Sequence, residues 1–319
     1  MPEHLVAPAF AGRLDRWLAG ELPLSRSRIQ ALIAQGQVTV DGQVARAAQT
    51  LRGGEAVVVT VPEQRPAGLV AQDLAVPVLF QDDHVIVVNK PPGLVVHPAA
   101  GHHDGTLVNA LLPSLPEADT DDADAAMRPG IVHRLDRGTS GVLVVARTPE
   151  ASAHLAAQFH AHSADRRYLA LVWGAPKDRA GTIDAPLGRH PSDRKRFAVV
   201  RDGRRAITRW RLAQSQPLPG GGVVSLLICQ LETGRTHQVR VHLLHLGLPV
   251  VGDPLYGRQG PVPPALVAAL EGLDHQLLHA GLLGFDHPAT GERVRFSAPP
   301  PPEWTPVLAA AKLDLPTEL

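Results

Sequence analysis

The chain has 319 residues, of which 44% are hydrophobic and 19% charged, so it is long enough for two unequal domains and is not mostly disordered. Its 31 basic and 31 acidic residues balance, and no apolar run approaches the ~18 residues of a membrane span, so we expect no membrane partner. A single cysteine, Cys229, excludes an internal disulfide and a cysteine-based zinc site, and the N-terminus lacks the pattern of an export signal, so we expect a cytoplasmic protein.

Residues 10–62 predict a small αα-β module. Apolar residues recur at helical spacing at Leu14, Trp17, Leu18 and Leu22. A second short helix is predicted from Ser27 to Gln35, with Gly36 as its end. The run VTVDGQVA predicts a hairpin around an Asp-Gly turn, and AVVVTV predicts a third strand. The proline-containing residues 63–77 then predict a linker.

The segment GRLDRWLAGELPLSRSRIQALIAQGQVTVDGQVA resembles the S4 RNA-binding domain. The resemblance implies that four side chains face RNA phosphates, namely Arg13, Ser25, Arg26 and Arg28. Asp41 stands where the family usually has Asn, which preserves the turn but adds a negative charge near the RNA face. Without the resemblance, the residues also allow a structural appendage that binds no RNA.

The segment 78–319 predicts a second, larger domain in which strands dominate. The strand-like runs include VLFQDDHVIVVNK, IVHRLD, GVLVVA, RYLALVWG, AITRWRLA and VVSLLICQLE. A helix is predicted from Pro149 to Ala161, capped by Thr148, and a short helix follows the proline-rich run near the C-terminus. Because no βαβ repeat is visible, we expect an α+β fold with a mixed, largely antiparallel sheet.

Basic residues cluster within this domain. Between Arg128 and Arg211 there are 17 basic and 7 acidic residues, and an acidic stretch from Glu117 to Asp124 precedes them. A neutral chain with one arginine-rich segment indicates a surface that binds a polyanion. The run GRHPSDRKRFAVVRDGRRAITRW fits an arm that contacts the nucleic-acid backbone, although a solvated surface loop fits it too.

The strongest chemical signal is IVHRLDRGTSGVLVVA. Asp136 lies between Arg134 and Arg137, directly before a tight corner from Gly138 to Gly141. Flanking guanidinium groups favour the ionised form of a carboxylate, which suits a nucleophile. The lack of a paired second acid argues against ordinary glycoside hydrolysis. The same spacing also allows a structural salt bridge at the end of a strand.

A second chemical signal is LETGRTHQVRVHLLHLGLPVVGDPLYG. We expect Thr236 to cap a helix from His237 onward, which places Arg235 and Arg240 near a helix start, where backbone donors favour anions. The sequence GDPLYG predicts a tight turn. The histidine pairs His102–His103 and His160–His162 lack good chelating spacing. His242 and His245 could share one helix face, but no HExxH motif accompanies them, so we expect no metal.

These motifs together resemble the RluA/RluD family of pseudouridine synthases, in its RluD-like branch. The matching pieces, in order along the chain, are HRLDRGTSG, RRYLALVWG, GRHPSDRKRFAV, LETGRTHQVRVH, GDPLYG and LLHAGLLGFDHP. The resemblance implies an enzyme that isomerises uridine in structured RNA to its C5-glycoside without a cofactor. It also implies the order seen here, an S4 module followed by the catalytic domain.

The resemblance assigns roles to particular residues. Asp136 matches the catalytic aspartate, which acts at the sugar carbon C1′ by covalent addition or by assisting proton removal at C2′. Tyr168 matches the aromatic residue that stacks on the target base, and Arg240 matches the partner of the aspartate. Arg134 either supports the displaced RNA loop or clamps a phosphate, and Arg137 and Arg235 are further expected substrate contacts.

The resemblance also implies the partner: a stem-loop of large-subunit (23S) ribosomal RNA or a pre-ribosomal particle. We further expect the protein to be a monomer. Two other classes of function remain open on the sequence. One is a non-catalytic RNA-binding factor for ribosome assembly. The other is a glycosylase that releases the base instead of reattaching it.

Overall fold

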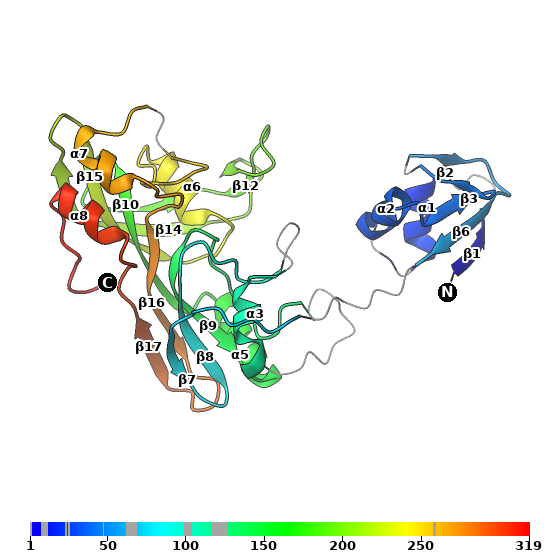
Figure 1. Ribbon diagram of the computed structural model, residues 1–319, viewed down its shortest axis with the longest axis horizontal. Helices are drawn as coiled ribbons and strands as arrows, with labels where there is room; N and C mark the ends of the chain where they lie inside the picture. Colours follow the sequence, from blue (N-terminus) through cyan, green and yellow to red (C-terminus); the bar gives the residue numbers. More distant parts are fainter. Residues whose placement is uncertain are drawn as a thin grey trace. The chain divides into compact units, whose positions relative to one another are not determined.

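The computed structural model describes residues 2–7, 12–22, 24, 26–46, 48–61, 69–98, 104–115, 127–257 and 260–319. The chain forms two compact units, Met1–Gly68 and Leu69–Leu319 (Figure 1). Ser25, the acidic stretch Glu117–Asp124 and the pair His102–His103 lie outside the described residues. The division after Gly68 puts the second part of the predicted linker into the larger unit, where Asn109 Nδ2 donates to the carbonyl oxygen of Val70 at 2.9 Å.

The smaller unit packs two helices against a four-stranded antiparallel sheet of order β1-β6-β3-β4, and a short ladder joins β2 to β5. Its elements are β1 (Pro2–Val6), β2 (Gly12–Arg13), α1 (Leu14–Glu21), α2 (Arg26–Ala34), β3 (Val38–Val40), β4 (Gln43–Val44), β5 (Thr50–Leu51) and β6 (Ala56–Thr60).

The predicted elements of this unit are confirmed. The two predicted helices are α1 and α2, and the predicted third strand is β6. The predicted hairpin turns at Asp41 and Gly42, which both have positive φ (48° and 79°), as a tight two-residue hairpin turn requires. The apolar residues of α1 and α2 pack with Val57 and Val59 of β6 in a core that this unit forms by itself.

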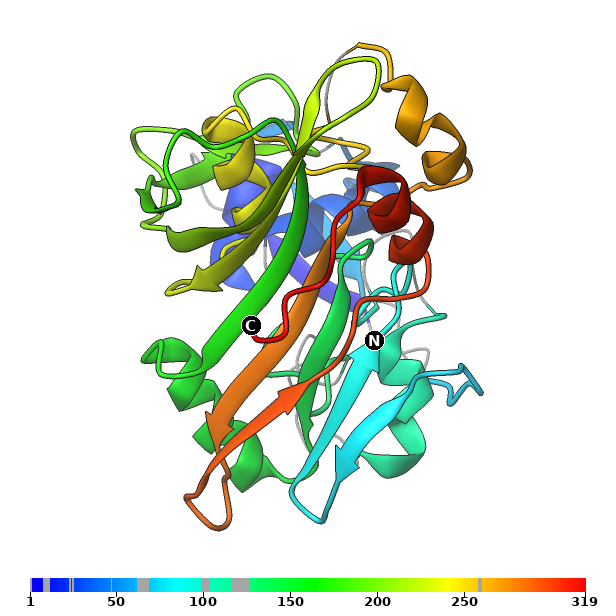
Figure 2. The same cartoon turned by 90° about the vertical axis from the view of Figure 1, so that its left-hand side faces the viewer.

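The larger unit is built on a nine-stranded sheet of order β11-β14-β15-β10-β16-β9-β8-β7, with β17 paired to β16 (Figure 2). Its strands are β7 (Val78–Gln81), β8 (Val85–Lys90), β9 (Ser140–Ala146), β10 (Asp165–Trp173), β11 (Ala180–Asp184), β14 (Ile207–Pro217), β15 (Val223–Leu231), β16 (Leu278–Asp286) and β17 (Arg293–Ser297). A separate ladder joins β12 (Leu187–Arg189) to β13 (Phe197–Val199). Within this sheet only the β9–β16 pair is parallel, which confirms the expected largely antiparallel α+β fold.

Helices cover both faces of the large sheet. They are α3 (Leu107–Leu111), α5 (Pro149–His160), α6 (Gln238–His245), α7 (Pro264–Val267) and α8 (Trp304–Ala311), with 3-10 turns at Leu112–Ser114 and Ala268–Leu270. Because side chains alternate along a strand, Leu169 and Leu171 of β10 pack with α8, whereas Tyr168 and Ala170 belong to the core that includes α6. The apolar side chains of α5 pack with alternate residues of β8 and β9.

The run IVHRLD is not a strand, contrary to the prediction. It follows the edge of β9 beyond the short β9–β16 pairing, where it forms only an isolated antiparallel bridge, between Ile131 and Val145. The N–H of Ala146 donates to the carbonyl oxygen of Gly130 at 2.9 Å, and the N–H of Val144 donates to Nε2 of His133 at 3.1 Å. The apolar, partly buried pattern therefore arises with a single bridge instead of a continuous ladder, and the chain then reaches the turn that carries Asp136.

That turn is held by a close approach of two strands. The N–H of Thr139 donates to the carbonyl oxygen of Asp136 at 3.0 Å, and β9 starts one residue later against β16. Gly141 has a φ of 121°, and a Cβ there would lie 2.2 Å from the carbonyl oxygen of Ala280. A glycine is therefore required both by the backbone conformation and by the neighbouring strand.

We predict that Gly141→Ala destabilises the larger unit far more than Gly93→Ala. Gly93 also has a positive φ, of 84°, but a Cβ there would meet nothing within 4 Å, so it isolates the backbone strain of about 1 kcal/mol. The overlap at Gly141 adds a further ~2–3 kcal/mol. Urea-induced unfolding followed by tryptophan fluorescence measures both, and equal losses would show that the strands can move apart at no cost.

Candidate active site

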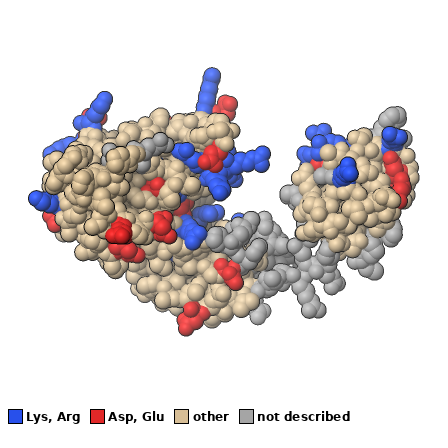
Figure 3. Space-filling view, turned by 45° about the horizontal axis from the view of Figure 1, so that its top comes forward, with Lys and Arg blue, Asp and Glu red and all other residues tan. Residues whose placement is uncertain are grey.

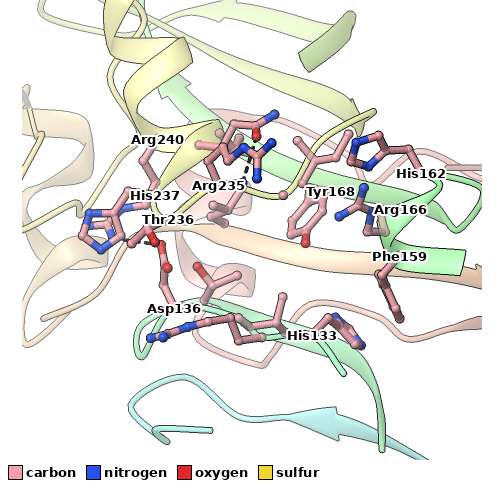
Figure 4. Close-up of a pocket in the computed structure, with 18 of the residues that line it drawn as sticks. His133, Asp136, Phe159, His162, Arg166, Tyr168, Arg235, Thr236, His237 and Arg240 are labelled. Carbon is pink, nitrogen blue, oxygen red and sulfur yellow. Dashed lines mark hydrogen bonds and ion pairs between the residues drawn. The ribbon is translucent and has the colours of Figure 1, made fainter. Parts of the chain in front are cut away.

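A cleft of about 340 Å³ opens on the face of the large sheet that carries Tyr168. This volume is within the range of small-molecule sites. The active cleft, as it is called below, is lined by Val132–Asp136, Thr139, Phe159, His160, His162, Arg166, Tyr168, Arg204, Leu231, Gly234–Arg240 and Leu278 (Figure 4). Three of the residues that the sequence singled out, Asp136, Tyr168 and Arg240, thus share one cavity.

Asp136 lies at the start of the turn before β9, and its side chain is 18% exposed. Its Oδ2 lies 3.0 Å from Nη1 of Arg240. This ion pair is the contact that the family resemblance implied. Because the carboxylate is only partly covered, one side of it remains open to a bound molecule.

Arg240 is fixed from its other side by a buried carboxylate. Its Nε and Nη2 donate to the two oxygens of Asp253 at 2.7 and 2.8 Å, and the Asp253 side chain is fully buried. The N–H groups of Leu255 and Tyr256 also donate to Asp253 Oδ1, so the GDPLYG turn orients this carboxylate. Burial alone would lower the pKa of Arg240, but its bonds to Asp253 and the charge of Asp136 raise that pKa above its usual range. The guanidinium therefore stays protonated and binds a carboxylate on each side, Asp253 on one and Asp136 on the other.

The start of α6 differs from the prediction, because Thr236 does not cap it. The N-cap residue is His237, in a left-handed conformation (φ 58°) with no side-chain capping bond. Instead, Oε1 of Gln238 accepts from the N–H of Arg235 at 3.0 Å and from Oγ1 of Thr233 at 2.8 Å. His237 Nδ1 lies 2.8 Å from Oη of Tyr256. The ring centre of Tyr256 lies 5.0 Å from Cζ of Arg240, so the guanidinium is placed over the ring. The loop before α6 and the GDPLYG turn are thus joined around Arg240.

Lys90, at the end of β8, ties the other side of the Asp136 turn. Its fully buried Nζ lies 2.9, 2.8 and 3.2 Å from the carbonyl oxygens of Pro91, Leu94 and Arg137. Burial lowers the pKa of Lys90 to about 7, against the nearby charge of Asp136, which raises it. Three carbonyl acceptors match the three N–H groups of an ammonium. Lys90 therefore anchors the residue directly after Asp136.

Tyr168 lies on β10, with its ring pointing into the active cleft (Figure 4). Burial raises the pKa of its phenol to about 12, while the charge of Arg166 lowers it and that of Asp136 raises it. The phenol therefore stays neutral at physiological pH. A neutral ring wall beside the carboxylate is suited to stacking on a base.

Of the other predicted substrate contacts in the larger unit, two line the active cleft and one does not. Arg134 is exposed and lines the active cleft, and so does Arg235, whose Nε donates to the carbonyl oxygen of Arg205 at 3.2 Å. Arg137 is not among the lining residues, and its Nε donates to the carbonyl oxygen of Gly93 at 3.1 Å. Figure 3 shows several Lys and Arg side chains projecting from the face of the larger unit that it draws.

In the smaller unit, the structure joins two of the predicted RNA contacts to Asp15. Arg13 donates to both oxygens of this buried carboxylate at 3.0 and 3.1 Å, and Arg26 donates to Oδ2 at 2.8 and 3.0 Å. Hydrogen bonds from Arg13, Arg26 and Gln30 hold the pKa of Asp15 well below its usual range. Both arginine side chains remain 45% exposed, so their contact with RNA stays a prediction. The side chain of Arg28 and all of Ser25 lie outside the described residues.

The described residues contain neither a cluster suited to a metal ion nor a helix suited to a membrane. Among them, no set of three or more His, Cys, Asp and Glu side chains is arranged to hold a metal ion. In the part of the chain that the structure describes, no helix has the length and apolarity needed to cross a membrane.

Comparison with known proteins decides the family. The family model described as RNA pseudouridylate synthase matches residues 84–245, and the S4 domain model matches residues 12–57. This chain belongs to the RNA pseudouridine synthase family. It is an RNA uridine-to-pseudouridine isomerase with an N-terminal S4 domain.

Individual relatives agree with this assignment. A protein of Xanthomonas campestris named ribosomal large subunit pseudouridine synthase D is 47% identical over 98% of this chain and 93% of its own length. A protein of the same name from Pseudomonas aeruginosa is 43% identical over 95% of this chain and 92% of its own length. The solved structure of human RNA pseudouridylate synthase domain containing 1 matches with a TM-score of 0.55 and 25% identity, over 72% of this chain and 85% of the human one.

Sequence reasoning missed Asp253, Lys90 and Tyr256 as parts of the site. GDPLYG is predicted as a tight turn and is one of the motifs that match the family, but its carboxylate and its tyrosine receive no role from the sequence. Lys90 is one of only four lysines in the chain and follows an apolar run, which is a signal for a buried, functionally placed cation. Tyr256 gave no separate signal.

We predict that Asp253→Asn slows pseudouridine formation about 10- to 100-fold and changes RNA affinity less than about threefold. The amide removes a charge and one of two acceptors for Arg240, which corresponds to a loss of ~1.5–3 kcal/mol in positioning Asp136. Single-turnover rates and filter binding measure the two effects.

The matched control is Asp165→Asn, which removes a carboxylate that pairs with Arg167 at 3.1 Å outside the active cleft. It should leave the rate within about twofold, because it does not touch Arg240. Equal losses in the two variants would contradict the role of Asp253.

Proposed function

We propose that this protein isomerises specific uridines in a stem-loop of large-subunit ribosomal RNA, with Asp136 as its catalytic carboxylate. The observation that carries the proposal is the partly exposed Asp136 carboxylate, held at 3.0 Å by a buried guanidinium inside a cleft with an aromatic wall. The ribosomal substrate is supported by the names of the relatives, ribosomal large subunit pseudouridine synthase D. We infer further that the protein acts as a monomer in the cytoplasm, on free RNA or on a pre-ribosomal particle.

In this proposal Asp136, Arg240 and Tyr168 each have a separate role in the reaction. Uracil must leave C1′, turn and return through C5, so the sugar carries positive character while the base is detached. The Asp136 carboxylate stabilises that charge, either by adding to C1′ or by assisting removal of the C2′ proton. Arg240 keeps the carboxylate aimed at the sugar through its hydrogen bond of 3.0 Å. The ring of Tyr168 holds the base by stacking while it turns.

The target nucleotide must leave its stack to reach the cleft, since a paired or stacked uridine hides C1′. Arg134 is exposed at the cleft and supports the displaced loop or clamps a phosphate. The arginine-rich segment from Arg189 to Arg211 supplies backbone contacts that add affinity without reading sequence. Arg137 and Arg235 contribute at the rims of this surface.

We predict that Asp136→Asn abolishes pseudouridine formation, by at least about 1,000-fold, because the amide can neither add to C1′ nor take a proton. The protein is incubated with ribosomal RNA from cells that lack it, and pseudouridine is mapped by chemical adduct formation. The exposed Asp178→Asn is the control and should keep the wild-type rate.

The same assay separates the competing functions. Abasic sites in place of pseudouridine would identify a base-releasing glycosylase. Tight RNA binding with neither product would identify a non-catalytic assembly factor. Pseudouridine that persists in Asp136→Asn would contradict the catalytic assignment of this residue.

A second prediction concerns the smaller unit. Removal of residues 1–68 should leave the larger unit folded, because the core of the smaller unit contains only its own residues. RNA affinity should fall about tenfold or more, since a tethered second binding module is lost, while the rate at saturating RNA stays within a few-fold. Circular dichroism and filter binding test this, and unchanged affinity would contradict RNA binding by the S4 domain.

A further inference from the structure

Arg166, at the start of β10, is a buried cation without a carboxylate partner. Only 7% of the residue is exposed, yet it lines the active cleft. Among the described residues its guanidinium donates one hydrogen bond, from Nη2 to the carbonyl oxygen of Glu232 at 3.2 Å, and its buried Nε has no acceptor. A guanidinium has five N–H donors, and an unpaired buried charge is costly. Arg166 therefore lacks an anionic partner among the described residues.

The nearest residues in sequence do not complete it. Asp165 binds Arg167 through two hydrogen bonds of 3.2 and 3.1 Å. The ring of Phe159 lies 5.7 Å from the Arg166 guanidinium, a contact that stabilises a cation but does not neutralise it. Burial lowers the pKa of Arg166, which indicates that the surrounding protein does not compensate its charge.

The surrounding lining residues add positive charge. Arg204 and Arg235 line the same cleft, and Asp136, the one carboxylate among the lining residues, pairs with Arg240. Figure 4 places Arg166 beside His162 and Phe159, with Tyr168 between it and Asp136. The cleft thus has one end that holds a carboxylate and another end that lacks anions.

The chain also leaves room for the guanidinium. A Cβ at Gly234 would lie 2.7 Å from Nη1 of Arg166, so any larger residue there would push the guanidinium aside. Gly234 thus lets the loop before α6 lie directly against this donor.

We propose that Arg166 binds a phosphate of the RNA backbone that flanks the target uridine. This inference rests on the proposed function, since that function supplies an RNA nucleotide whose base and sugar occupy the cleft between Tyr168 and Asp136. A phosphodiester is the anion that necessarily enters with them, and its oxygens match the fork of a guanidinium. Arg166 then fixes how deep the nucleotide sits, and so where C1′ lies relative to Asp136.

Binding of three probes to the full chain tests this site: uridine, uridine 5′-monophosphate and uridine 3′-monophosphate. Ligand-observed saturation-transfer NMR gives their dissociation constants. One monophosphate should bind about tenfold or more tightly than uridine, as expected for hydrogen bonds to a charged group. Which of the two binds tighter identifies the flanking phosphate. No advantage for either monophosphate would overturn the proposal.

Substitutions show whether Arg166 is the residue that binds the phosphate. Arg166→Gln should abolish the monophosphate advantage and keep the affinity for uridine within about twofold, while Arg167→Gln on the same strand should keep the advantage. Gly234→Ala retains the charge of Arg166 but displaces its guanidinium, so it should also reduce the monophosphate advantage. If Arg166→Gln does not fold, Gly234→Ala is the variant that tests the proposal. An advantage that persists in Gly234→Ala and in folded Arg166→Gln would overturn the assignment.

Pseudouridine formation by the same preparations separates this inference from the proposed function. Wild-type protein that forms pseudouridine but shows no monophosphate advantage would refute the phosphate site alone. Wild-type protein that shows the advantage, lost in Arg166→Gln, but forms no pseudouridine would support the phosphate site and count against the proposed function.

Discussion

The buried ion pair between Arg240 and Asp253 is the constraint on which the active cleft depends. Both side chains are withdrawn from water, so the pair persists only because its hydrogen bonds are complete: two to Arg240 and two from the backbone of the GDPLYG turn. One guanidinium nitrogen, Nη1, is left over and faces Asp136. The Asp136 carboxylate thus takes its position from an ion pair whose far member, Asp253, does not line the active cleft.

The large sheet makes this arrangement rigid. Asp136 reaches the cleft from the turn before β9, Arg240 from α6 and Tyr168 from β10, so three distant parts of the chain meet over one face of the sheet. Lys90 fixes the residue after Asp136, and the close contact of Gly141 with β16 fixes the strand that follows. Sites that rest on strands and buried polar contacts hold their geometry better than sites on free loops.

Much of this could be predicted from the sequence, because the signals were local. The Asp41–Gly42 turn, the Thr148 cap of α5 and the apolar runs of β10 and β15 each follow from residues close together in the chain. The long motif around Asp136 and its likeness to a family gave the pairing with Arg240, more than 100 residues away. Neither composition nor periodicity could have given that contact.

What could not be predicted depends on tertiary contacts. Ile131–Asp136 has the pattern of a strand, but it forms only one bridge with β9, between Ile131 and Val145, and the His133 ring accepts from the N–H of Val144. Thr236 has the residue type of a helix cap, but the N-cap residue is His237 in a left-handed conformation, and the Gln238 side chain instead binds the loop before the helix. Arg13 and Arg26 have the charge to bind phosphate, and the structure joins them to the buried Asp15, a partner that spacing alone does not reveal.

The most direct test of this account is a double-mutant cycle on Arg240 and Asp253, read as single-turnover rates of pseudouridine formation. If Asp253 acts only by orienting Arg240, then Asp253→Asn slows the wild-type enzyme but has almost no effect in the Arg240→Met background. The account predicts this strong non-additivity. Rate losses that simply multiply in the double variant would show that the two residues act independently, and would contradict the claim that the buried pair positions Asp136.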